Sequence, residues 1–156
     1  EIGEGKGRGF TANVPLPPGA SNVAYEYALG QIFAPLAREF RPQIIIRNGG
    51  SDPHFADELT DLGLTMDGFR MIGRKVKEVA EEVCGGRRVD LLGSGYNQTV
   101  LPIAWLALVA GSAGINLALD EPFFVSLRTD FKLEETRQVV EDVKANLRSH
   151  WKCFRS

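Results

Sequence analysis

The chain has 156 residues, and 44% of them are hydrophobic, which is enough for the core of one folded, soluble domain. The net charge is −2 with acidic and basic residues interspersed, which argues against a surface for nucleic acid or for an anionic membrane. Cys84 and Cys153 lie far apart, without a CxxC motif or a Cys/His cluster, which argues against a disulfide scaffold and a structural zinc site. We expect a reducing, cytoplasmic compartment.

Two features bear on targeting and membranes. The sequence starts at Glu1 without an initiator methionine or a basic-then-apolar leader, so we expect no signal peptide and regard the chain as a piece of a longer protein. Residues 99–119 approach the roughly twenty apolar residues that a bilayer span needs. Pro102, the small residues 111–114 and Asn116 interrupt this run, so it predicts a buried helix followed by a tight turn.

The first part of the chain predicts a loop, a short strand, a helix and a second strand. Residues 1–9 carry alternating glycines and predict a mobile loop, and FTANV at 10–14 predicts a short strand. A helix follows the PLPPG segment and should be kinked at Pro35. Its cap and apolar positions are Ser21-Asn22, Ala24, Ala28, Ile32, Leu36 and Phe40. Ile44, Ile45 and Ile46 form a β-branched run without alternation, which predicts that residues 44–47 are a central strand covered on both faces.

The second part predicts three further helices and one strand. A helix begins after Thr65 and ends at Gly85-Gly86, with Phe69, Ile72, Val76, Val79 and Val83 on one face. A strand is predicted at 89–92, and Asn97 can cap an apolar helix over 98–110. The last helix runs from Leu133 to about Ser149.

Strands alternating with helices predict an α/β fold, with a parallel sheet, flanking helices and right-handed crossovers. In such sheets ligands bind outside the carboxyl ends of the strands. Asp52 follows the strand at 44–47, and Tyr96 follows the strand at 89–92. We therefore expect Asp52 and Tyr96 at the same edge of the sheet.

Two segments at this edge carry candidate chemistry. Asp52, His54, Asp57 and Asp61 have the side chains of metal ligands, and Asp52 and His54 could share a cation because they lie two apart in an extended segment. The alternative is a solvated turn with an Asx cap. The GSGYN turn fits neither a phosphate loop nor a serine-hydrolase elbow. In a functional interpretation, its glycines allow the backbone to approach a ligand closely, and the Tyr96 hydroxyl can donate to a developing oxyanion. The structural alternative is a tight turn with a half-buried tyrosine.

The segments FTANVPLPPG, IIIRNGGSDPHFADEL, GLT and LLGSGYN, in this order, resemble the C-terminal half of the histone deacetylase superfamily, which includes acetylpolyamine amidohydrolases and acetoin-utilisation proteins. The resemblance covers about residues 5–110. It implies an arginase-like, three-layer α/β fold with a catalytic divalent metal at the carboxyl ends of the parallel strands. The metal is usually zinc, and iron is the alternative.

The resemblance also implies roles for individual residues. Asp52 matches a carboxylate metal ligand, and Tyr96 matches the catalytic tyrosine, whose hydroxyl stabilises the oxyanion as metal-activated water attacks an acetamide. Leu59 matches an apolar position on the wall of a substrate tunnel, and Gly95 matches the glycine at its floor. His54 becomes either a residue at the rim or one that supports the metal ligands from behind, and in neither role does it bind the metal.

The sequence departs from the family at three positions: Ala56 and Glu58 stand where Gly and Pro are common, and Ser94 replaces a glycine. The paired histidines and the other Asp and His ligands of the family belong to an N-terminal half that this chain lacks. One carboxylate does not hold a catalytic zinc, so the chain alone should be inactive.

We therefore interpret residues 1–156 as a single domain-sized portion of a larger deacetylase. Its expected partners are an acetylated amine (acetyl-lysine, acetylpolyamine or a similar amide) and either the missing half or a second copy of the chain, with no nucleic acid and no membrane. The competing hypothesis is a non-catalytic α/β module that binds a ligand or partner at the same edge.

Overall fold

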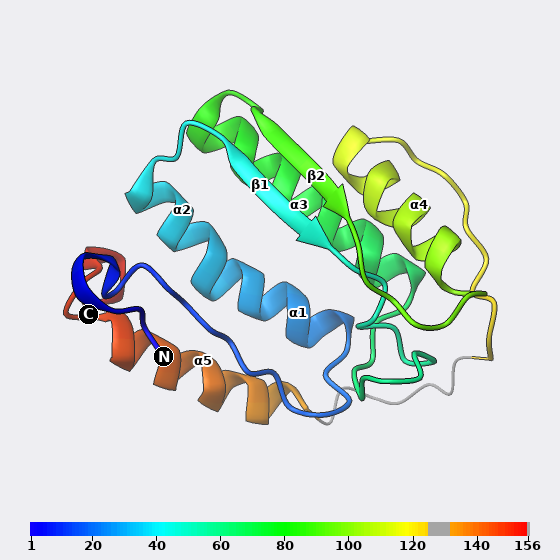
Figure 1. Ribbon diagram of the computed structural model, residues 1–156, viewed down its shortest axis with the longest axis horizontal. Helices are drawn as coiled ribbons and strands as arrows, with labels where there is room; N and C mark the ends of the chain where they lie inside the picture. The colour runs from blue at the N-terminus through cyan, green and yellow to red at the C-terminus, as the bar shows by residue number, and fades with distance from the viewer. Residues whose placement is uncertain (125–131, 156) are drawn as a thin grey trace.

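The computed structural model describes residues 1–124 and 132–155. Two parallel strands and a set of helices form an α/β structure, which confirms the predicted class (Figure 1). In chain order the elements are η1 (Gly5–Gly7), α1 (Asn22–Ala28), η2 (Leu29–Phe33), α2 (Ala34–Phe40), β1 (Ile45–Gly49), α3 (Met66–Cys84), β2 (Arg88–Leu92), α4 (Leu101–Ala113), α5 (Leu133–Leu147) and η3 (Lys152–Phe154). No helix in the described ranges is long and apolar enough to cross a membrane.

The segments α1, η2 and α2 form one continuous helical rod, because Ala28, Leu29 and Ala34 all have right-handed helical dihedrals. The middle segment, η2, is π-helical. Pro35 follows directly, and its missing N–H removes one bond of the α-helical ladder. The irregularity predicted at Pro35 thus takes the form of a π-helical turn. The rod ends at Arg41, which adopts a left-handed conformation.

The strand β1, the helix α3 and the strand β2 form a parallel crossover unit, in which Ile45 pairs with Arg88 and Gly49 pairs with Leu92. The helix α3 lies behind the strands in Figure 1, and α4 lies beside β2 and packs closely on α3. Glycines permit this approach, since a Cβ at Gly73 would collide with the backbone of Leu108. Residues of α2, β1 and α3 share one buried cluster, so α2 covers the same face of the sheet as α3.

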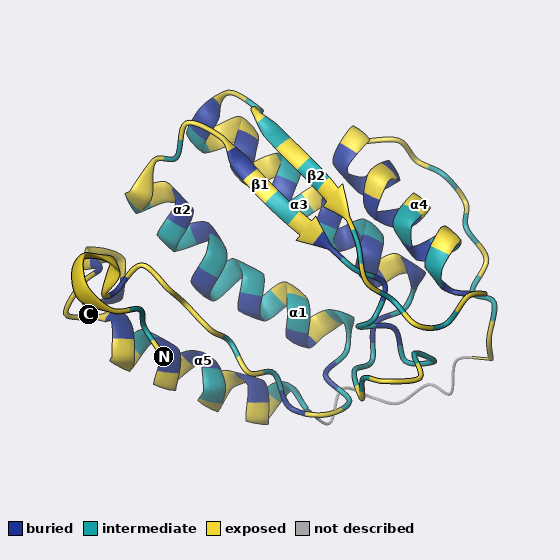
Figure 2. Ribbon diagram, viewed as in Figure 1, coloured by how far each residue is buried: buried dark blue, intermediate teal, exposed yellow. Residues whose placement is uncertain are grey.

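The other face of the sheet is open, so the expectation that residues 44–47 are covered on both faces is wrong for this chain. Ile46 is 64% exposed, and Val89 and Leu91 on the neighbouring strand are also exposed (Figure 2). Side chains alternate along a strand, and those of Ile46 and its partner Val89 point away from α3 and α4. Within the described residues no element packs on this face, so the chain itself supplies two layers of the three-layer fold of which it was predicted to be a part.

The segment FTANV is not a strand, contrary to the prediction. It runs extended beside α1 and α5, and the described residues offer it no neighbouring strand with which to form a ladder (Figure 1). It is held instead through side chains and through its neighbour Gly9, whose carbonyl accepts a 2.6 Å hydrogen bond from Trp151 Nε1. Val14 packs on the cluster that α5 forms with the helical rod.

Candidate functional site

Two loops meet beyond the carboxyl ends of the strands: residues 50–65, which connect β1 to α3, and residues 93–100, which connect β2 to α4 (Figure 1). They continue the pairing of the sheet, because Gly93 N donates to Gly49 O at 3.2 Å and Ser51 N donates to Ser94 O at 3.1 Å. The loops that carry Asp52 and Tyr96 therefore lie side by side at the carboxyl-terminal edge of the sheet, where the sequence predicts them.

The glycines of both loops allow this close approach. Gly95 has a φ of 129°, and a Cβ there would collide with the Ser51 hydroxyl. A Cβ at Gly50 would collide with Ser94 and with the Asp52 carboxylate. Ser94 has a φ of 65°, a conformation that costs a residue with a Cβ about 1 kcal/mol and that glycine adopts freely. This conformation explains why glycine is the residue expected at position 94.

The Asp52 carboxylate lies at this junction. Its Oδ1 accepts a 2.9 Å hydrogen bond from the Ser94 hydroxyl, and its backbone carbonyl accepts one from the Thr60 hydroxyl. Burial, together with the negative charge of Asp52, raises the pKa of the Tyr25 phenol to about 12. Tyr25 belongs to α1 and stays neutral near Asp52 at physiological pH. Sequence reasoning missed Tyr25 because nothing local connects it with the loop after β1.

Tyr96 is 50% exposed, and its backbone N–H donates to Asp57 Oδ2 at 2.9 Å. The other oxygen of Asp57 accepts from the amides of Leu59 and Thr60, at 3.0 and 3.3 Å. A further hydrogen bond joins the loops, because Asn97 Nδ2 donates to Ala56 O at 2.7 Å. Asp57 thus serves as an acceptor for backbone amides, and its link to Tyr96 was not foreseen from the sequence.

His54 is fully buried, which rules out a place at the rim, while the alternative, a residue that supports the metal site without binding the metal, stays a prediction. Its Nε2 lies 2.8 Å from Glu121 Oε1, while Nδ1 accepts from the Ala56 amide at 3.1 Å. The second oxygen of Glu121 accepts from the amide of Met66 at the start of α3. Because both ring nitrogens are engaged, His54 and Asp52 are not arranged to share a cation. The ring lies between Phe55 and Phe69 and fixes the loop to the helix.

The histone deacetylase domain is the family model that matches this sequence, over residues 1–112. The chain belongs to the histone deacetylase family. It is 38% identical over 162 residues to a probable deacetylase of Archaeoglobus fulgidus, an alignment that covers 99% of this chain and 45% of that protein. It is 35% identical over 142 residues to a histone deacetylase-like amidohydrolase of Pseudomonas aeruginosa, covering 91% of this chain and 36% of that protein. The chain therefore spans less than half the length of either relative.

Solved structures of histone deacetylases share the fold of the chain. The histone deacetylase Clr3 superposes with a TM-score of 0.81 at 24% identity, over 98% of this chain and 24% of that one. The HDA15 HD domain gives a TM-score of 0.78 at 23% identity, over 99% of this chain and 39% of that one. Both neighbours extend well beyond the part that matches this member of the family.

This deacetylase-family chain provides part of a metal site at most. Across residues 1–124 and 132–155, no three His, Cys, Asp or Glu side chains are grouped so that they could hold a metal ion. The Asp52 carboxylate has the chemistry of one ligand and is partly accessible, whereas a catalytic zinc usually takes three protein ligands and a water. The residues present fit one corner of such a site, and the ligand role of Asp52 stays a prediction.

The two positions expected to line a substrate tunnel lie in the same two loops. Leu59 is 71% exposed and is held through its backbone by Asp57, and Gly95 lies between Ser94 and Tyr96 in the turn after β2. An exposed leucine beside an exposed tyrosine offers apolar contact to a ligand from one side. The tunnel itself needs a second wall, so these two roles also stay predictions.

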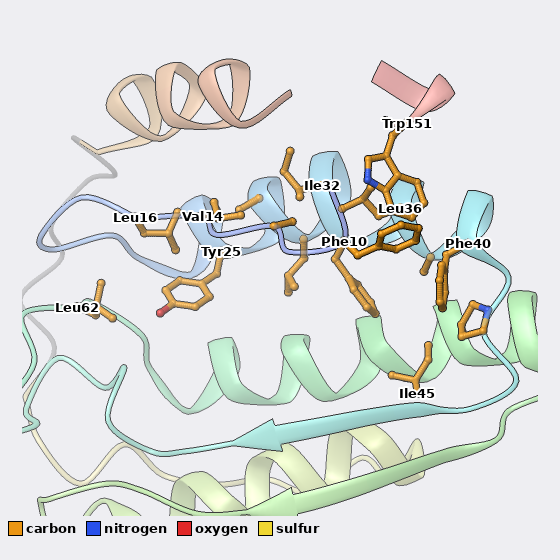
Figure 3. A pocket seen from close by; sticks show the side chains of 16 residues that line it. Phe10, Val14, Leu16, Tyr25, Ile32, Leu36, Phe40, Ile45, Leu62 and Trp151 are labelled. Atoms are coloured by element: carbon orange, nitrogen blue, oxygen red, sulfur yellow. The ribbon is translucent and has the colours of Figure 1, made fainter. Parts of the chain in front are cut away.

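A large apolar cavity of about 650 Å³ lies between residues 10–16, the helical rod and β1, and one end of it reaches Leu62 in the loop after β1. Figure 3 shows Phe10, Phe40 and Trp151 at one end and Tyr25 and Leu62 at the other. Among the described residues that line it, Tyr25 is the only one with an ionisable side chain. The cavity therefore lacks groups for acid–base chemistry and is a gap in packing beside the free edge of β1.

Proposed function

We propose that the chain is the C-terminal part of a metal-dependent deacetylase that hydrolyses an acetamide, with Asp52 as one metal ligand and Tyr96 as the donor to the carbonyl oxygen. The observation that carries this proposal is the hydrogen-bonded junction of the two loops, which brings both residues to one edge of the sheet. The deacetylase names of the relatives support the reaction class.

In the proposed reaction the metal, when bound, supplies a Lewis acid that polarises the carbonyl and activates water. The Tyr96 hydroxyl donates a hydrogen bond to the carbonyl oxygen as that oxygen gains negative charge. Its exposure of 50% leaves it accessible to a substrate. Leu59 and Gly95 guide the apolar part of the acetylated amine. General acid–base catalysis needs a further positioned side chain, which we assign to the part of the domain outside this chain.

The test of this function is hydrolysis by the complete protein. With an acetyl-lysine peptide and an acetylpolyamine as parallel substrates, we expect acetate release, loss of activity on chelation, and recovery with added Zn²⁺ or Fe²⁺. The 156-residue chain alone should release no acetate. A complete protein that is inactive on both substrates with either metal would contradict the function. Full activity of the isolated chain would contradict the incomplete site.

The open face of the sheet supports a second part of the proposal, that the rest of the domain packs on β1 and β2. Ile46, Val89 and Leu91 present apolar side chains there, and a contiguous apolar patch usually marks an interface. The relatives and structural neighbours are longer than this chain, and we assign the cover of the open face to the corresponding additional residues.

Mixing the chain with the separately produced remainder of the protein is expected to give a 1:1 complex, measured by analytical ultracentrifugation. Ile46→Asp should weaken the complex at least about tenfold, because it places a charge in the buried interface. Val23→Asp is the matched control, since Val23 is exposed on α1, away from the sheet. A complex that tolerates Ile46→Asp, or a stable homodimer formed in its place, would contradict this cover.

A further inference from the structure

We propose that Asp57 is a positioning residue for Tyr96, which it holds through the backbone amide; this inference rests on the proposed function. Each of the two carboxylate oxygens accepts hydrogen bonds from a different loop. Oδ1 accepts from Leu59 N and Thr60 N within its own loop, and Oδ2 accepts from Tyr96 N across the junction. Hydrogen bonds to an ionised acceptor are stronger than bonds between neutral groups.

Tyr96 makes no other hydrogen bond across the junction in the described structure, although its neighbours Ser94 and Asn97 are bonded to the loop after β1. Half of the residue is exposed, and within the part of the chain that the structure describes its hydroxyl has no hydrogen-bond partner. The preceding Gly95 has a wide range of backbone conformations, so the turn by itself does not fix the direction of the side chain. The bond from Tyr96 N to Asp57 acts directly at the residue that carries the phenol.

The same loop also carries Asp52, whose carboxylate is bonded to Ser94 from the Tyr96 loop. Two of the hydrogen bonds across the junction run from the loop after β2 to carboxylates of the loop after β1: Ser94 donates to Asp52, and Tyr96 donates to Asp57. The proposed metal ligand and the proposed oxyanion donor belong to one hydrogen-bonded unit. A displacement of about 1 Å at such a site can cost about 10²-fold in rate.

Asp57→Asn in the complete protein tests this role. Asparagine keeps a carbonyl oxygen for the amides of Leu59 and Thr60 but turns its NH₂ group toward Tyr96 N, so that two donors face each other. We expect kcat to fall about 10- to 100-fold, with KM and bound metal within about twofold of the unsubstituted protein. Glu58→Gln is the matched control, because Glu58 is the exposed neighbour and the substitution makes the same change in charge.

A double substitution separates positioning from general destabilisation. If Asp57 acts through Tyr96, kcat of Asp57→Asn/Tyr96→Phe should equal that of Tyr96→Phe alone. Losses that multiply would overturn the inference, and so would an active protein in which Asp57→Asn leaves kcat unchanged. Absence of hydrolysis by the unsubstituted protein would overturn the proposed function and this inference together, whereas an active protein insensitive to Asp57→Asn overturns the inference alone.

Hydrogen exchange gives a measurement that needs no variant and no substrate. In the unsubstituted protein the Tyr96 amide should exchange at least about tenfold more slowly than the Gln98 amide, which lies in the same loop without a hydrogen-bond acceptor in the described structure. Equal exchange at the two amides would mean that Asp57 does not hold Tyr96, and would overturn the inference even if Asp57→Asn fails to fold.

Discussion

Tyr96→Phe in the complete protein is expected to lower kcat for deacetylation about 10²- to 10³-fold, the usual cost of removing one donor to a developing oxyanion. Phenylalanine keeps the ring and the backbone amide bonded to Asp57, so the junction of the loops stays intact. Only the hydroxyl is lost. Steady-state kinetics on an acetylated peptide measures the effect, and metal analysis of the same sample should show unchanged metal content.

Tyr27→Phe is the control for this loss. Tyr27 lies on α1 with its ring under the Arg137 guanidinium, away from the loops, and the substitution removes the same hydroxyl group. Its kcat should equal that of the unsubstituted protein. If Tyr96→Phe also retained full activity, the assigned role of the tyrosine would be wrong.

Asp52→Asn should lower metal affinity by at least about 10²-fold, because even residues that only support a metal ligand cost 10- to 100-fold when they are replaced. Asparagine has nearly the same shape as aspartate and keeps a carbonyl oxygen for the Ser94 hydroxyl, so the loop should keep its conformation. The lost negative charge is then the cause of the change. Competition with a chromophoric chelator measures the affinity, and activity should fall in parallel at limiting metal concentration.

Asp61→Asn makes the same chemical change at an exposed position of the same loop and should leave metal affinity unchanged. Equal affinities of the Asp52→Asn protein and the unsubstituted protein would exclude the carboxylate as a ligand. Since Tyr96→Phe spares the metal and Asp52→Asn removes it, the two variants together distinguish oxyanion stabilisation from metal binding.

The order of elements and the parallel pairing were predictable, because periodic apolar residues and glycine stops are local features of the sequence. The strand prediction for FTANV was wrong, because a strand also requires a neighbour with which to share its backbone hydrogen bonds. The prediction for residues 44–47 was wrong for a related reason. The run of isoleucines indicates that both faces of the strand suit burial, but it does not say which part of the protein covers each face. Ile46 is exposed because no described element packs on its face.

In the candidate site, too, local patterns predicted the position of some residues, whereas contacts with distant residues were not predictable. Asp52 and Tyr96 were placed at one edge because each follows a strand directly, and parallel strands end at the same edge. The burial of His54 depends on Glu121, 67 residues later, and no local pattern connects them. The bond from Asp57 to Tyr96 spans 39 residues and joins a side chain to a backbone group that every residue type carries, so the sequence holds no signal for it.

Ser94 affects both the folding stability of the protein and the position of the Asp52 carboxylate. Its left-handed backbone lowers folding stability by about 1 kcal/mol relative to glycine, while its hydroxyl restrains the Asp52 carboxylate. If Asp52 is the metal ligand proposed above, that restraint reduces the side-chain entropy lost when the metal binds. Under that proposal, serine at this position lowers folding stability and favours metal binding, and glycine would have the opposite two effects.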